Sequence, residues 1–226
     1  MLSRTIWVCA VLALAAPQAC WCAAKVHTVA LGSVRHEPYS AAGDPAGAQK
    51  EEKLLNVRPL VVDGKVREWT TGDVHEVTER SFAVRRAVRL NDSLPGDRGT
   101  KWVWQRGPWV LVDRGSGKVT ALHLPDFDPA VSTVIWFRDY AAYCGVNASG
   151  KHLYAVVAQV AARRPLMAKK LQAWDAANHE SPVCAPAVWQ RDPLKVTFQA
   201  SGADPVSFDL VGTSAVLVED GDNENE

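Results

Sequence analysis

The densest hydrophobic pattern in the chain runs from residue 131 to residue 171 and predicts strands folded back on one another. Residues 134–137 (VIWF) are an unbroken β-branched and aromatic run, which is typical of a strand buried on both faces. Further strands are predicted over residues 140–146 and 152–160. The residues between them, Asn-Ala-Ser-Gly-Lys, favour a chain reversal. This pattern predicts an antiparallel hairpin at the centre of the fold.

Shorter apolar segments with turn residues between them occur along the rest of the chain. Asp63-Gly64 separates two apolar runs, which is a strong hairpin signal, and Gly107-Pro108 separates two Trp-rich runs. The strands predicted on this basis cover residues 26–34, 60–62, 65–69, 82–90, 102–104, 109–112, 119–124, 194–199, 206–211 and 215–218.

One segment has a helical pattern. Met167, Leu171 and Trp174 recur at helical spacing, and the Ala and Lys residues between them favour a helix. Pro165 fits a helix start, and Pro182 lies beyond the end. We therefore expect one short helix near residues 167–177.

Together the segments predict an all-β fold of antiparallel sheets with that one helix. Residues 109–124 and 140–160 both place a Ser-Gly-Lys turn between two apolar strands. With this repeated pattern, residues 102–171 resemble the blade hairpins of β-propeller proteins. The resemblance implies propeller-like hairpins, and a β-sandwich is the alternative that the strand pattern leaves open.

The beginning of the chain has the pattern of an export signal. Residues 5–16 are an apolar run too short to span a bilayer, and Cys22-Ala23-Ala24 offers a cleavage site. We expect a signal peptide over residues 1–24, with cleavage near Ala24 and a periplasmic or secreted product. The alternative is a lipoprotein anchored through Cys20, although Pro17 and Gln18 fit a lipidation motif poorly.

The remaining chain is expected to form one antiparallel β domain over residues 25–218, with no transmembrane segment. Residues 40–53 are rich in Gly, Ala, Pro and charge, so we expect a mobile surface loop there. Residues 219–226 (EDGDNENE) are acidic and lack apolar residues, which predicts a disordered tail.

Cleavage would leave two cysteines, Cys144 and Cys184. An even pair in an exported protein favours one disulfide. It would close a loop of about forty residues and stabilise the fold by about 3–4 kcal/mol. The alternative is a Cys144 nucleophile with His152 or His179 as its base, but no catalytic signature surrounds this cysteine.

Two groups of residues are candidates for ligand binding. Trp102, Trp104 and Trp109 lie close together in sequence and could stack on sugar rings, whereas burial in the core is the usual role of Trp. Arg85, Arg86 and Arg89, together with Arg80, could bind an anionic ligand. The alternative for these arginines is a solvated strand face paired with nearby acids.

The net charge and the lack of known sequence motifs limit the classes of function that the sequence supports. The 25 basic and 25 acidic residues cancel, which gives no electrostatic basis for a nucleic-acid partner. No catalytic, nucleotide-binding or metal-binding motif occurs, so we expect no cofactor and no metal. The sequence favours an exported, non-catalytic binding protein of the cell envelope or exterior, with a glycan or an envelope protein as its partner.

The alternative function is an exported hydrolase that acts on glycans or other envelope polymers. Such an enzyme would use carboxylates in loops, because paired acids carry out glycoside hydrolysis. The candidate acids are Glu68, Asp126, Asp128 and Asp139.

Overall fold

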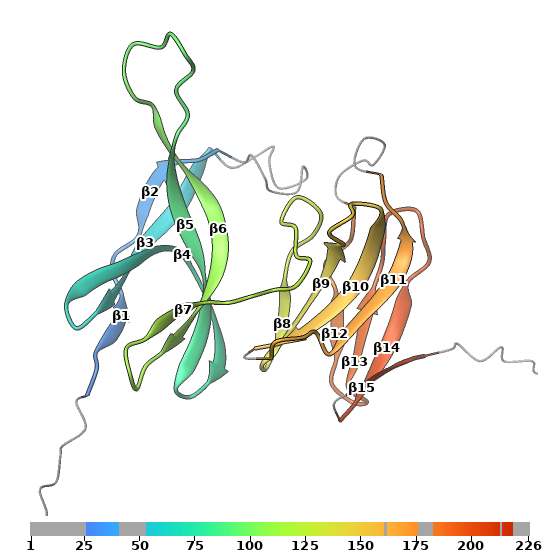
Figure 1. Ribbon diagram of the computed structural model, residues 1–226. Helices are drawn as coiled ribbons and strands as arrows, with labels where there is room; N and C mark the ends of the chain where they lie inside the picture. Colours follow the sequence, from blue (N-terminus) through green and yellow to red (C-terminus); the bar gives the residue numbers. More distant parts are fainter. Residues whose placement is uncertain (1–25, 41–52, 161, 176–182, 213, 219–226) are drawn as a thin grey trace, which may run out of the picture.

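The computed structural model describes residues 26–40, 53–160, 162–175, 183–212 and 214–218. All regular elements in these ranges are β-strands. The strands form one seven-stranded sheet and two four-stranded sheets, and paired strands are antiparallel (Figure 1). The prediction of an antiparallel all-β protein is confirmed.

We call the seven-stranded sheet the barrel. Its neighbouring strands follow the order β1-β3-β4-β5-β6-β7, and β2 pairs with the other part of β3. The strands are β1 (Val29–Leu31), β2 (Arg35–Pro38), β3 (Leu54–Val62), β4 (Lys65–Thr78), β5 (Ser81–Asn91), β6 (Trp102–Asp113) and β7 (Val119–Ala121). As expected, the β3–β4 hairpin turns at Asp63-Gly64, and both residues have positive φ, as a tight two-residue turn requires.

At one end, the barrel closes on itself. Tyr39, which follows β2, forms a parallel bridge with Trp104 of β6, and the amide of Ser40 donates a hydrogen bond of 2.9 Å to the carbonyl of Trp104. Because β2 also pairs with β3, strands β2 to β6 form a ring at this end.

The barrel holds two separate apolar clusters. The first lies toward β1 and β7 and consists of Leu60, Phe82, Val84, Val110 and Val112. The second lies at the closed end and consists of Leu55, Val57, Ala87 and Trp104, with Tyr39 and Trp69 packed against it. The long strands β3, β5 and β6 contribute to both clusters.

We call the two four-stranded sheets the sandwich. Their orders are β11-β10-β9-β8 and β12-β13-β14-β15, so each is built from consecutive strands. The strands are β8 (Ile135–Phe137), β9 (Tyr140–Val146), β10 (His152–Gln159), β11 (Met167–Ala173), β12 (Val188–Gln190), β13 (Lys195–Phe198), β14 (Val206–Val211) and β15 (Ser214–Leu217).

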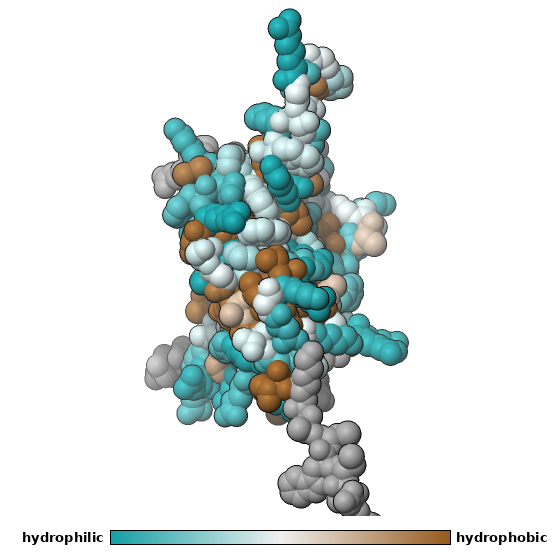
Figure 2. Space-filling model, turned by 90° about the vertical axis from the view of Figure 1, so that its left-hand side faces the viewer, coloured by the Kyte–Doolittle hydropathy of each residue, from teal (hydrophilic) through white to brown (hydrophobic). Residues whose placement is uncertain are grey.

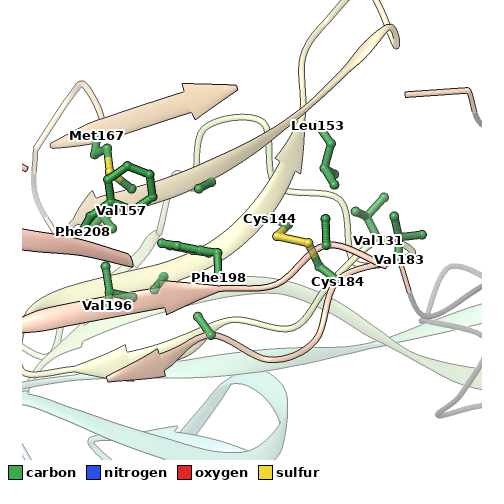
Figure 3. Packing of buried hydrophobic residues seen from close by; sticks show 14 of the residues in the cluster. Val131, Cys144, Leu153, Val157, Met167, Val183, Cys184, Val196, Phe198 and Phe208 are labelled. Carbon is green, nitrogen blue, oxygen red and sulfur yellow. A yellow bond between two sulfur atoms is a disulfide. The ribbon is translucent and has the colours of Figure 1, made fainter. Parts of the chain in front are cut away.

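One large apolar core lies between the two sheets of the sandwich (Figure 3). Leu153 and Val157 of β10 face Val196 and Phe198 of β13 across it, together with Phe208 of β14. The predicted disulfide is present: Cys144 of β9 is bonded to Cys184, which bridges to Ala200 beyond β13, with 6.3 Å between the two Cα atoms. This bond links the two sheets covalently inside the core.

The helix predicted near residues 167–177 is wrong, because Met167–Ala173 is strand β11. It pairs with β10 from Met167↔Val157 to Ala173↔His152. Met167 and Leu171 are four residues apart, which fits one face of a strand as well as one face of a helix. Pairing with β10 and burial of Met167 in the core outweigh the helix propensity of the Ala and Lys residues, because tertiary contacts override local propensity.

Residues 122–134 connect the barrel to the sandwich, and we call them the connector. Their side chains cover the outer face of β9 and β10, where Leu124, Phe127 and Val134 pack against Tyr143 and Val156. The Tyr143 hydroxyl donates a hydrogen bond of 2.7 Å to the carbonyl of Pro125, and burial raises the pKa of this tyrosine. Both faces of β9 and β10 are therefore buried. Residues 134–137, for which burial on both faces was predicted, are only half-buried.

The barrel and the sandwich also meet through aromatic side chains. The ring of His75 in β4 stacks on Trp136 of β8, with 5.1 Å between ring centroids, and Trp109 of β6 contacts the same Trp136 edge-on. Nε2 of His75 lies 2.5 Å from the carbonyl oxygen of Arg138.

The remaining predictions concern the two ends of the chain, the loop after β2, the domain division and the two similar hairpins. The signal peptide, the acidic tail and residues 41–52 of the expected surface loop lie outside the described residues. The division into a single β domain stays a prediction. The two hairpins that share the Ser-Gly-Lys turn lie in different sheets, β6–β7 in the barrel and β9–β10 in the sandwich.

Candidate ligand-binding site

An open pocket lies at the closed end of the barrel, with a volume of about 390 Å³. Strands β2, β4, β5 and β6 each contribute to its wall, so it is formed only when the ring of strands is complete. The residues that line it are Arg35, Glu37, Trp69, Ala87, Arg89 and Trp104.

Two indole rings form the apolar part of the pocket. Trp69 and Trp104 meet edge to face, with 5.7 Å between ring centroids, an arrangement that aromatic pairs favour. Trp104 is only 9% exposed and packs on Leu55 and Val57, so the cluster below holds it in place. The pocket therefore has a fixed aromatic base.

Two guanidinium groups lie at the polar part of the pocket. The guanidinium of Arg35 lies 5.1 Å from the ring centroid of Trp69, and that of Arg89 lies 4.9 Å from the ring centroid of Trp102. Both side chains are exposed. Within the described parts of the chain, neither forms an ion pair. With Glu37, the lining carries two positive charges and one negative charge.

Other arginines of the barrel have structural partners. Arg58 donates from Nε to the carbonyl of Gly32 at 2.8 Å, and Arg86 pairs with Glu68 at 2.5 Å. Arg106 donates to the hydroxyl of Tyr39 and also lies over its ring, next to the point where the barrel closes. These contacts hold strands together, which distinguishes these arginines from Arg35 and Arg89.

The structure brings together some of the residues singled out from the sequence and separates others. Trp104 and Arg89 face each other as a cross-strand pair and both line the pocket, and Trp102 lies beside Arg89. Trp109, in contrast, packs against Trp136 of the sandwich. Arg85 donates from Nε to the carbonyl of Gly107 at 3.0 Å, and neither Arg85 nor Arg86 lines the pocket.

An irregularity in the β5–β6 pairing explains this separation. The register shifts between Arg85 and Ala87, opposite Gly107-Pro108, so strict alternation along β5 breaks there. Val84 points into the first apolar cluster and Ala87 into the second, an odd spacing that a regular strand does not allow. Arg89 shares the pocket with Ala87 as a result.

Half of the pocket was not anticipated from the sequence. Arg35 and Glu37 come from β2, and Trp69 comes from the predicted β3–β4 hairpin. The available signal was period-two alternation: Arg35, Glu37 and Tyr39 share one face of an extended segment. It could not show that this segment lies against β6.

The alternative catalytic residues are engaged elsewhere. Cys144 is in the disulfide and so cannot act as a nucleophile, and His179 lies outside the described residues. Asp139 accepts a hydrogen bond of 2.7 Å from Gln159, and Asp128 accepts one of 2.8 Å from the amide of Ala130. Asp126 has a positive φ of 56° in the connector.

Electrostatic effects are clear at the opposite end of the barrel. Arg114 donates two hydrogen bonds of 2.7 Å to the two oxygens of Glu76, and this contact lowers the pKa of Glu76 below its usual value. Hydrogen bonds from Ser116 likewise lower the pKa of Asp113 in the β6–β7 turn. Both contacts stabilise the turns at this end.

No family model matches the chain, and no curated protein or solved structure is significantly similar to it. Among the residues that the structure describes, His, Cys, Asp and Glu do not gather into a group that could hold a metal ion. The same residues contain no helix that could cross a membrane.

Proposed function

We propose that this chain is an exported, non-catalytic binding protein that takes a glycan into the Trp69–Trp104 pocket of the barrel. The observation that carries the proposal is the convergence of two indoles and two guanidinium groups from four strands on one open pocket. Sugars have apolar ring faces and polar rims, so a site with aromatic and charged groups side by side suits them.

Export is supported by the disulfide, since such bonds persist in oxidising compartments. The apolar run near the start of the chain supports the same conclusion. A binding role is supported by the pocket itself: among the residues that the structure describes, its lining has one carboxylate, Glu37, and so no pair of acids for glycoside hydrolysis.

The proposal is tested by titrating a panel of neutral and acidic glycans into the protein by isothermal calorimetry. We expect at least one to bind, and Trp69→Ala to abolish this binding. Trp189→Phe is the matched control, because Trp189 stacks on Phe137 in the sandwich and Phe preserves a ring there. Circular dichroism and thermal melting establish that each variant folds.

A second variant covers the case in which Trp69→Ala unfolds the barrel. Ala87 is buried against Trp104 and lines the pocket, so Ala87→Leu places a larger side chain into the cavity without removing an aromatic residue. It should also abolish binding. The proposal is contradicted if no glycan of the panel binds, or if binding survives in a folded Ala87→Leu protein.

A further inference from the structure

Beyond the pocket, we propose that the ligand is an acidic oligosaccharide, and that Arg89 and Trp102 form a second subsite that takes its next sugar units. This inference rests on the proposed function, because it extends the same site. It is carried by the continuation of the pocket along β6 and by the guanidinium groups of Arg35 and Arg89, which form no ion pair with any residue in the described ranges.

The first step is the geometry of β6. Trp104 and Trp102 are two residues apart and so project from the same face of the strand, about 7 Å apart along it at the usual rise per residue. Arg89 lies opposite Trp104 in the strand pairing, and its guanidinium lies 4.9 Å from the ring centroid of Trp102, so its side chain reaches from one Trp position to the other. The pocket residues thus continue outward as Trp104, Arg89 and Trp102.

The second step is exposure. Trp102 is 47% exposed, whereas Trp104 next to it is 9% exposed. A half-exposed indole beside a binding pocket offers contact area to a ligand that extends out of the pocket. The β5–β6 hairpin also projects well beyond the rest of the barrel (Figure 1).

The loop that joins β5 to β6, residues 92–101, is held in place by its own hydrogen bonds. Ser93 Oγ donates to the carbonyl of Gly99 at 3.0 Å and accepts from the amide of Lys101 at 2.6 Å. Lys101 also pairs with Asp92 at 2.9 Å. These contacts lie directly before Trp102 in β6, so its position does not depend on the ligand.

The third step is charge. Arg35 and Arg89 are held over aromatic rings, and among the described residues no carboxylate neutralises either of them. Glu37 is the only acid among the described residues of the lining, so this part of the lining carries a net positive charge. Figure 2 shows the barrel side of the molecule, where apolar side chains gather at the centre among hydrophilic ones. Guanidinium groups beside indole rings suit a sugar chain that bears carboxylates.

The test compares oligogalacturonates of increasing length with their methyl-esterified forms, measured by calorimetry at fixed salt. Polygalacturonate, alginate, hyaluronan and heparin complete the acidic panel. We expect affinity to rise with length, and the methyl esters to bind about tenfold or more weakly. Arg89→Gln should reduce the preference for the acid over the ester.

Variants separate the two subsites. Trp102→Ala should weaken the longer oligomers about three- to tenfold and leave the shortest binding oligomer unchanged. Trp102→Phe, which keeps a ring, should restore most of the loss. Trp69→Ala should abolish binding at every length. Because Trp102 is half-exposed, its exchange leaves the barrel core intact.

Each outcome bears on a different part of the inference. Equal binding of acids and esters contradicts the acidic ligand but leaves the proposed function standing. An equal effect of Trp102→Ala at all lengths, or no effect, contradicts the second subsite. Binding of neutral glycans alone overturns the inference while the proposed function stands, and binding of no glycan overturns both.

Discussion

The barrel and the sandwich bury their apolar residues in different ways. The sandwich closes two sheets around one continuous core and fastens them with a disulfide. The barrel has two smaller clusters, and the open pocket at its closed end is lined by charged side chains beside indole rings. A site needs polar groups that are not neutralised by the fold itself, and the barrel pocket combines such groups with two indole rings. The sandwich has a smaller pocket, of about 240 Å³, where Lys169 and Lys170 lie beside Leu171 and Phe208. We therefore expect the sandwich to contribute mainly stability and the barrel to contribute recognition.

Removal of the disulfide should cause the largest loss of stability, and this loss should fall on the sandwich. Replacing Cys144 and Cys184 together by Ala releases a loop of 40 residues, which should lower the free energy of unfolding of the sandwich by about 3–4 kcal/mol. Chemical denaturation of the oxidised protein, the reduced protein and the double variant gives the measurement.

If the two regions are energetically separate, the double variant should retain glycan binding in the barrel. A matched loss of binding would mean that the pocket depends on the sandwich, most directly through the contact of His75 and Trp109 with Trp136.

A smaller loss of stability is expected from a substitution at Gly145, where the connector lies against the sandwich. A Cβ at Gly145 would come within 2.6 Å of the carbonyl oxygen of Asp126, and this backbone cannot move without breaking its hydrogen bond to Val146. Gly145→Ala should therefore destabilise the protein by about 1–3 kcal/mol in thermal or urea unfolding.

The control for this change is Gly115→Ala. There the added Cβ meets Nη2 of Arg80, the movable end of a flexible side chain, and stability should change by no more than about 0.5 kcal/mol. Equal effects of the two substitutions would mean that the close approach of the connector contributes little.

The smallest loss of stability is expected when the ion pair between Arg114 and Glu76 in the barrel is removed. Because this contact lowers the pKa of Glu76 in the folded state, it stabilises the protein above the usual carboxyl pKa, and this stabilisation is lost as the pH falls through the lowered value. Both side chains are partly exposed, so Glu76→Gln should cost only about 0.2–1 kcal/mol at neutral pH.

The same substitution should change nothing once the pH is low enough to protonate Glu76 in the native protein. Urea unfolding of the two proteins across the acidic range makes this comparison. A difference that persists unchanged at low pH would assign the effect to packing of the side chain rather than to its charge.

The sequence was most informative where its pattern was local. The runs around Tyr143 and Val156 predicted an antiparallel hairpin at the centre of the fold, and β9 and β10 form it, covered by the connector and the sandwich core. The run around Trp136 predicted a strand buried on both faces, but β8 is half-buried. The pairing of Cys144 with Cys184 followed from their number and from the expected compartment. These inferences needed no knowledge of which distant segments meet.

Only half of the pocket could be predicted from the sequence, because the pocket depends on contacts between distant segments. Trp104 and Arg89 were recognised as candidates, but Arg35, Glu37 and Trp69 belong to strands whose proximity depends on closure of the ring. One register shift at Arg85–Ala87 then decided which arginine faces the pocket. The helix expected near residues 167–177 failed for a related reason: a spacing of four residues suits both periods, and the partner strand made the choice.

Trp104 has two roles that cannot be separated. Its indole packs on Leu55 and Val57 in the second apolar cluster, and it also forms the base of the pocket. Exchange of this side chain therefore alters the barrel core and the site together, whereas Arg35 and Arg89 are exposed and can change without opening that core. A new ligand preference, whether acquired in evolution or by engineering, would begin at those two positions and leave Trp104 in place.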